Sequence, residues 1–169
     1  VGAADGITFS NTYYFEKQGW KGICLEPNPE NYHLASQVRR DVRQLAVSGK
    51  NGTQKFLVSA ESADWSRLLS KNDEVKDEDI IEVKTITLDE LVRNEKIQQI
   101  DLLSIDTEGT EIEVLHSLDF TKYHPQIIIV EHLNRGALNS KKDIQDFFKP
   151  LPYKLAHTTK SNFILVYEK

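Results

Sequence analysis

Short apolar runs alternate with longer amphipathic runs along the whole chain, and this alternation restricts the fold more than any other feature. Apolar runs of about four to eight residues are typical of strands, and longer runs with a period of about 3.6 are typical of helices. Strands that alternate with helices favour an α/β fold with a mostly parallel central sheet and helices on both faces. We therefore expect a single domain over residues 1–169, a length that suits one ordinary domain.

The predicted elements follow this alternation from end to end. Helices are expected over residues 9–19, 29–40, 88–95, 110–117 and 141–148, and strands over 22–26, 42–47, 54–59, 82–86, 101–106 and 126–131, with a closing antiparallel hairpin over 153–157 and 162–167. We expect strand 54–59 at an edge of the sheet, strand 101–106 at its centre, and strand 126–131 covered on both faces. Asn28 before Pro29, and Thr87 before Leu88, are the expected helix N-caps.

A glycine-rich turn opens the chain, and an acidic residue follows the next predicted strand. The turn is Gly2-Ala3-Ala4-Asp5-Gly6, and Glu26 stands 24 residues after Gly2. Such a turn lets a ligand approach the backbone, and an acid about 20 residues further on accepts the ribose hydroxyls of an adenosine. Each feature alone also has a plain structural reading, as a tight turn or as a carboxylate that caps a helix.

The turn favours S-adenosylmethionine over a dinucleotide. The dinucleotide motif G-x-G-x-x-G is incomplete, and the Asp5 carboxylate would repel a pyrophosphate. S-adenosylmethionine carries an ammonium and a sulfonium, which suit a cleft lined by carboxylates. Its own carboxylate needs donors, for which we expect backbone N–H groups at the start of the first helix, Ser10 or Asn11.

Acidic residues also follow two later strands. Asp106 ends strand 101–106, and Glu131 and His132 end strand 126–131. Because ligands bind at the carboxyl ends of parallel strands, we expect Asp106 and Glu131 to face each other there. His132 is a candidate general base, or else a polar strand end without a role. For Glu108 and Glu111 we expect favourable charges in a first helical turn.

These residues lie in segments that resemble the FkbM family of S-adenosylmethionine-dependent methyltransferases. The matching segments are VGAADGITFSNTYYFEKQGWKGICLEPNPENY, LAVSGKNG, VKTITLDELV, IDLLSIDTEGTEIEVLHSLDF and IIIVEH, in the family's order from Val1 to His132. The resemblance implies a Rossmann-like class I methyltransferase fold and, in many members, O-methylation of a sugar or a small natural-product hydroxyl. The family's first strand would precede Val1, so we expect the natural protein to have residues before it.

The resemblance also implies roles for single positions. Gly2, Ala3, Asp5 and Gly6 fall on the cofactor turn, Glu26 on the ribose ligand, Pro27 and Asn28 beside the adenine, Ala46 and Val47 on the segment bordering the adenine ring, and Asp106 at the methionine end.

Methyl transfer to a hydroxyl needs a positioned acceptor and, for an alcohol, removal of its proton. We expect Asp106 or His132 as the base, with Glu131 as its orienting partner. A divalent cation held by Asp106 and Glu131 is an alternative, and oxygen donors would favour Mg²⁺. Residues 62–79, with Trp65 and Arg67, are expected to form a mobile loop over the acceptor, or a merely solvated segment.

Composition excludes some classes of binding partner. A formal net charge of −5 argues against nucleic acid, and no apolar run is long enough to span a membrane. The lone cysteine, Cys24, excludes an intrachain disulfide and suits a cytoplasmic protein. We expect a small-molecule or saccharide acceptor. The alternatives are a dehydrogenase and a non-catalytic or truncated Rossmann-like nucleotide-binding module.

Overall fold

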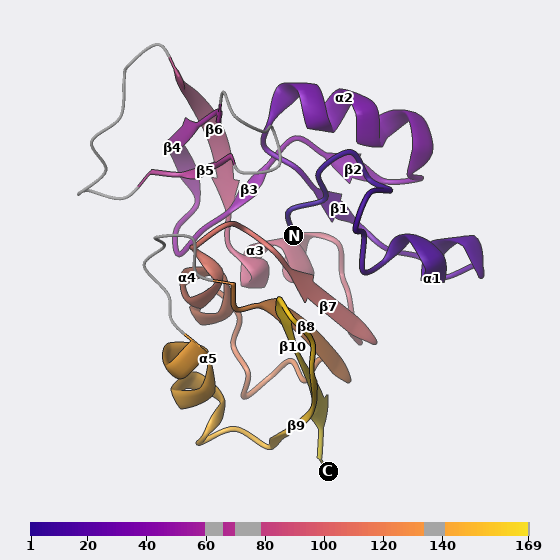
Figure 1. Cartoon of the computed structure of the whole chain (residues 1–169), viewed down its shortest axis with the longest axis vertical. Helices are drawn as coiled ribbons and strands as arrows, with labels where there is room; N and C mark the ends of the chain where they lie inside the picture. The colour runs from indigo at the N-terminus through magenta and orange to yellow at the C-terminus, as the bar shows by residue number, and fades with distance from the viewer. Residues whose placement is uncertain (60–65, 70–78, 134–140, 169) are drawn as a thin grey trace. The chain divides into compact units, whose positions relative to one another are not determined.

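The computed structural model describes residues 1–59, 66–69, 79–133 and 141–168. The chain forms two compact units, each with its own sheets (Figure 1). The first unit is Val1–Val47 with Asn51–Ile86, and the second is Ser48–Lys50 with Thr87–Lys169. The expectation of a single domain over residues 1–169 stays a prediction.

The described residues of the first unit form two helices and two small sheets. Its elements are α1 (Tyr13–Lys17), β1 (Cys24–Leu25), α2 (Pro29–Val38), β2 (Val42–Arg43), β3 (Ala46–Val47), β4 (Gly52–Leu57), β5 (Arg67–Leu68) and β6 (Ile80–Ile86). Strands β1 and β2 are parallel. The other sheet has the order β3-β6-β4-β5, in which only β3 and β6 are parallel. Its buried core consists of Ala46, Phe56, Leu68 and Val83.

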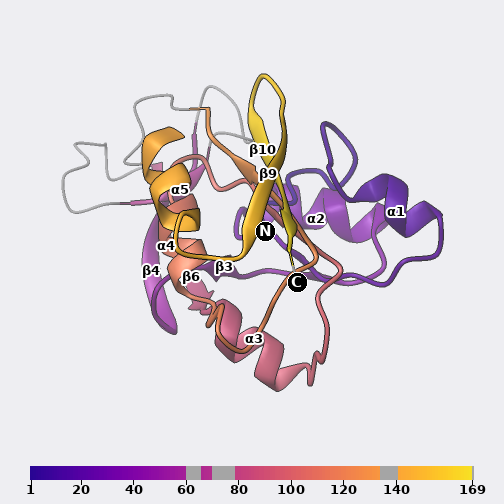
Figure 2. The same ribbon diagram turned by 90° about the horizontal axis from the view of Figure 1, so that it is seen from below.

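The second unit is built on one four-stranded sheet. Its elements are α3 (Leu88–Asn94), β7 (Leu102–Ile105), α4 (Glu111–His116), β8 (Ile127–Glu131), α5 (Lys141–Phe148), β9 (Tyr153–Thr158) and β10 (Asn162–Tyr167). The strand order is β7-β8-β10-β9. Strands β7 and β8 are parallel, and β9 and β10 form an antiparallel hairpin, which Figure 2 shows side by side.

Apolar burial holds the second unit together. Ile105, Ile128 and Val130 from the sheet are fully buried, as are Val114 and Leu115 from α4. Full burial of such a side chain contributes about 1.5–3 kcal/mol. Ile127 and Ile129 are only half-buried, so β8 is covered more completely on one face than the continuous apolar run predicts.

Several predicted elements are confirmed. Helix α5 has the predicted bounds, and β8 and the closing hairpin agree within one residue. Asn28 and Thr87 accept N–H donors from Glu30 and Glu90 and cap their helices as expected.

Other predicted elements are wrong. The first helix begins at Tyr13 rather than at residue 9, because Phe9 has a left-handed φ of 54°. The predicted strand 42–47 is two strands in two sheets, separated where the Leu45 N–H donates back to the Arg43 carbonyl. Strand β4 is internal rather than at an edge, and β7 is at an edge of its sheet rather than at the centre.

The sheet as a whole also departs from expectation. The described strands form a mixed α/β structure with three separate sheets, and only three of their seven strand pairings are parallel. A single, mostly parallel Rossmann-like sheet is therefore not confirmed. Most of the expected loop 62–79, including Trp65, lies outside the described residues, whereas Arg67 belongs to the short strand β5.

Candidate functional site

In the first unit, Glu26 lies against the glycine-rich turn. It follows β1 directly, and its side chain is 5% exposed in relative terms. One carboxylate oxygen accepts the Ala4 N–H at 2.8 Å, and the other accepts the Asn28 N–H at 2.9 Å. The turn and the acid that the sequence paired by spacing are therefore in contact, and the carboxylate joins the turn to the start of α2.

Burial changes the protonation of Glu26. Loss of water raises its pKa to about 7, and the N–H donors of Asn28, Ala4 and Ala3 oppose that rise by stabilising the anion. The carboxyl group thus changes charge near neutral pH. A titratable group with such a shift beside a glycine turn marks a candidate ligand site.

The turn itself has a specific backbone shape. Gly2 and Gly6 have φ of 72° and 87°, and Ala4 shares this left-handed region with a φ of 46°. Glycine adopts such angles without steric cost. The Gly2 N–H donates to the Leu25 carbonyl at 3.0 Å, which fastens the turn to β1.

Asp5 serves the turn's own structure. Its carboxylate accepts the N–H groups of Ile7 and Thr8 at 2.8 and 2.7 Å and the Thr8 hydroxyl at 2.6 Å. Burial opposes ionisation, but the hydrogen bonds from Thr8 and Ile7 outweigh it and lower the pKa of Asp5. Its acceptor atoms are thus already engaged in shaping the loop, and its contact with a cofactor stays a prediction.

Arg39, which sequence reasoning missed, is hydrogen-bonded to the turn. Its guanidinium donates to the Glu16 carboxylate at 2.8 Å, to the Gly6 carbonyl at 3.0 Å and to the Thr12 hydroxyl at 3.0 Å. The Arg39 and Glu16 side chains are both almost fully buried. A Cβ at Gly6 would lie 2.8 Å from the Arg39 Cγ, so this contact requires glycine. No local sequence pattern links these residues, which come from α1 and the residue before it, from the residue after α2, and from the turn.

Four residues expected near the adenine, and Asn11, expected at the cofactor's carboxylate, have their own places in the structure. Asn28 is buried, caps α2 and donates its amide to the Ser66 hydroxyl at 3.2 Å. Ala46 and Val47 form β3 and are buried. Pro27 and Asn11 are half-buried. The predicted roles of these five residues in cofactor binding stay predictions.

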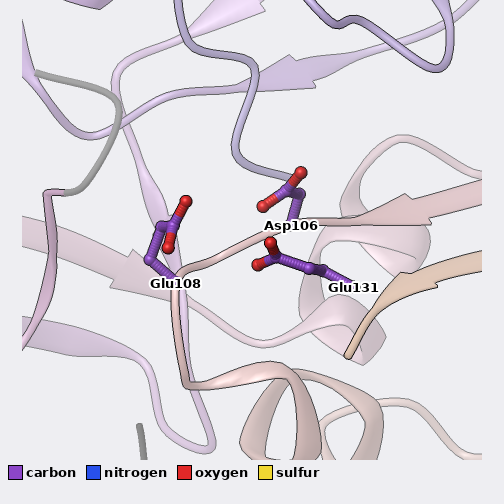
Figure 3. Close-up of side chains that lie close together, drawn as sticks. All are labelled: Asp106, Glu108 and Glu131. Carbon is purple, nitrogen blue, oxygen red and sulfur yellow. The ribbon is translucent and has the colours of Figure 1, made fainter. Parts of the chain in front are cut away.

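In the second unit, three carboxylates converge at the ends of β7 and β8. The parallel register pairs Ile105 with Val130, so Asp106 and Glu131 leave the sheet next to each other, as predicted. Glu108 joins them from the turn before α4. One oxygen of each carboxylate lies within 4.8 Å of the others, and Figure 3 shows the three side chains directed toward one another.

Glu111 shapes the turn that carries Glu108. One of its carboxylate oxygens accepts the Thr107 N–H and hydroxyl, both at 2.9 Å, and the Gly109 N–H at 3.0 Å. Glu108 between them has a left-handed φ of 54°, which is uncommon for a residue other than glycine. The structural role expected for Glu111 is therefore present. The convergence of Glu108 on the strand ends is a site feature that sequence reasoning missed.

Glu131 is the most perturbed of these acids. It is 7% exposed, and burial, followed by repulsion from Asp106 and Glu108, raises its pKa to about 9. A hydrogen bond with Asp106 also favours the protonated form. At neutral pH the cluster thus holds a proton on Glu131. The raised pKa of Glu131 suits it to donate a hydrogen bond to Asp106 and so orient that side chain.

His132 lies beside this cluster in sequence but is packed differently. It is 4% exposed, its ring lies 4.3 Å from the Phe163 ring, and its backbone N–H donates to the Ser161 carbonyl at 2.7 Å. Neither ring nitrogen has a hydrogen-bond partner within the part of the chain that the structure describes. Its role as general base stays a prediction.

Comparison with known proteins gives one family and no individual relative. No curated protein and no solved structure matches the chain. Among the described helices, none combines the length and the apolar character that crossing a bilayer requires. A family model described as the methyltransferase FkbM domain matches residues 1–155 of the 169. The match covers more than half of the chain, and the chain therefore belongs to the FkbM methyltransferase domain family.

Proposed function

We propose that this protein is an S-adenosylmethionine-dependent methyltransferase that methylates a hydroxyl oxygen of a sugar or small natural product. Family membership supports methyl transfer to a small molecule. The observation that carries the choice of donor is the contact of the buried Glu26 carboxylate with the glycine turn at Ala4. A cytoplasmic setting, expected from the lone cysteine, is part of the same proposal.

The Glu26 carboxylate has capacity left for a ligand. A carboxylate offers about four acceptor sites, and the N–H groups of Asn28, Ala4 and Ala3 use three of them. The remaining lone pair can accept a hydroxyl proton from a ribose. In this proposal the glycines let the donor approach the turn, and Glu26 holds its sugar.

For Asp106 and Glu131 we propose a role in removing the proton of the acceptor hydroxyl. When bound, the donor would supply an electrophilic methyl group to an acceptor oxygen and would leave as its thioether. Positioning of the two reactants supplies about 7–11 kcal/mol of a barrier, and proton removal adds about 10²–10⁴-fold in rate. Asp106 would take the hydroxyl proton, and protonated Glu131 would orient it by their hydrogen bond. The alternative base, His132, and the position of Asp106 at the methionine end stay predictions.

Calorimetry with S-adenosylhomocysteine tests the proposal. We expect one site per chain, and Glu26→Gln should weaken binding about tenfold or more, because it removes the charge and replaces one acceptor with a donor. Glu30→Gln, an exposed acid of α2, is the matched control and should bind like the wild type. Equal affinity in Glu26→Gln would overturn the assignment, as would tighter binding of a nicotinamide dinucleotide.

A second readout separates an enzyme from a binding module. Methyl transfer from labelled donor to a panel of sugar and natural-product alcohols is expected for the wild type. Donor binding without transfer to any acceptor would instead favour the non-catalytic nucleotide-binding module.

A further inference from the structure

The cluster of Asp106, Glu108 and Glu131 brings three acidic side chains close together. One oxygen of each lies within 4.8 Å of the others, and Figure 3 shows that the carboxylates point into a common space. Glu131 is buried and the other two side chains are half-buried, so negative charges at such distances would repel one another more strongly than in bulk water. The arrangement is stable only when a positive charge or a proton lies among them.

Glu131 gives an independent reason to expect a ligand in that space. Its carboxylate is more than nine-tenths buried and points toward the other two. Its Oε2 atom has no exposed surface and no hydrogen-bond partner within the described residues. A buried carboxylate oxygen without a partner is costly, since the water it has lost is not replaced. A bound ligand would satisfy it.

The spacing fits a hard divalent cation. Oxygen ligands lie at about 2.3–2.6 Å from Ca²⁺ and about 2.0–2.1 Å from Mg²⁺, so two of them on opposite sides of the ion are about 4–5 Å apart. A separation of 4.8 Å or less therefore lets one ion contact all three carboxylates with small side-chain movements. Two carboxylates, as the sequence suggested, would make a much weaker site than three.

We propose that Asp106, Glu108 and Glu131 together bind one divalent cation of the Mg²⁺, Mn²⁺ and Ca²⁺ class. The three ligands come from the ends of β7 and β8 and from the turn that Glu111 holds in place. The cation would satisfy the partnerless oxygen of Glu131 and neutralise the cluster. Only its further role, to hold an acceptor hydroxyl and lower that hydroxyl's pKa, rests on the proposed function.

Calorimetric titration with MnCl₂ at one fixed pH, without any methyl donor, tests the site. We expect one Mn²⁺ per chain with a Kd of about 0.1–1 mM, the range of modest oxygen-ligand sites. Glu108→Gln and Glu131→Gln should each weaken binding about tenfold or more, because affinity follows the number of charged ligands. The control Asp101→Asn, an exposed acid just before the start of β7, should bind Mn²⁺ like the wild type. Parallel titrations with MgCl₂ and CaCl₂ identify the preferred ion.

Thermal unfolding provides a second measurement. MnCl₂ should raise the Tm of the wild type and of Asp101→Asn but not that of Glu108→Gln. If Glu131→Gln fails to fold, the half-buried Glu108 still decides the result. The proposal is overturned if the wild type shows no saturable binding, if the Glu108 and Glu131 variants bind as it does, or if only an ammonium probe such as methylammonium binds. Cation binding and S-adenosylhomocysteine binding are measured separately, so failure of one leaves the other standing.

Discussion

A single buried carboxyl group makes the first unit sensitive to pH. Glu26 has a pKa of about 7 in the folded chain and an ordinary value of 4.5 when unfolded. The folded chain therefore binds more protons than the unfolded chain between these values. The contribution of Glu26 to the free energy of unfolding is fully present below pH 4.5 and is lost as the pH rises through about 7.

If Glu26 holds the donor's ribose as proposed, the same carboxyl group sets the pH dependence of donor binding. Ribose hydroxyls donate to an ionised carboxylate. Glu26 must therefore lose its proton when the S-adenosyl ligand binds. We predict that the Kd for S-adenosylhomocysteine rises about tenfold per pH unit as the pH falls below the Glu26 pKa of about 7. Calorimetry across this range checks it, with Glu26→Gln losing the dependence. A flat wild-type profile would contradict the ribose assignment.

The buried Arg39–Glu16 ion pair makes a second prediction at the scale of single residues. Arg39→Met leaves the Glu16 carboxylate buried without its cation, and we expect a loss of about 3–5 kcal/mol in the free energy of unfolding. Denaturant titration measures this loss. Arg43→Met is the control, because its partner Asp41 is far more exposed, and it should cost less than about 1 kcal/mol. Similar losses in both variants would show that Arg39 does not hold the turn as described.

At the scale of elements, the turn between β7 and α4 depends on one side chain. Glu111→Ala removes the acceptor shared by the Thr107 and Gly109 N–H groups and leaves buried donors unsatisfied. We predict a loss of about 1–3 kcal/mol in unfolding free energy and weaker Mn²⁺ binding, because Glu108 is no longer held in its left-handed conformation. Asp143→Ala, on the exposed face of α5, should change neither quantity. Unchanged Mn²⁺ affinity in Glu111→Ala would show that the turn does not position Glu108.

The elements also show which features local sequence patterns can predict. Helix α5 and the caps Asn28 and Thr87 were predictable because apolar spacing and capping chemistry act within a few residues. The break between β2 and β3 was not predictable, because residues 42–47 look like one continuous strand in the sequence. That break coincides with a backbone hydrogen bond from the Leu45 N–H to the Arg43 carbonyl, which no residue type in the run indicates.

In the candidate site, too, some residues were predictable from the sequence and others were not. Asp106 and Glu131 were predictable neighbours, because parallel strands place successive carboxyl ends together. Glu108 was expected only as a charge at a helix start, since nothing in its neighbours indicates a left-handed φ. Arg39 was missed entirely, because its partners lie on other elements.

At the scale of the whole molecule, strand pairing was the least predictable feature. The alternation of strands and helices indicated one mostly parallel sheet, whereas the described strands form three sheets in two compact units. Pairing joins residues far apart in sequence, so a local period cannot specify it. Family membership nevertheless spans both units, because the matching model runs from residue 1 to residue 155.

A crystal structure of the protein with S-adenosylhomocysteine bound tests the central claim most directly. The proposed function predicts that a ribose hydroxyl lies within about 2.5–3.0 Å of a Glu26 carboxylate oxygen, with the ligand against the turn from Gly2 to Gly6. A ribose bound away from Glu26, or no ligand bound at saturating concentration, would contradict the assignment of this chain as an S-adenosylmethionine-dependent methyltransferase.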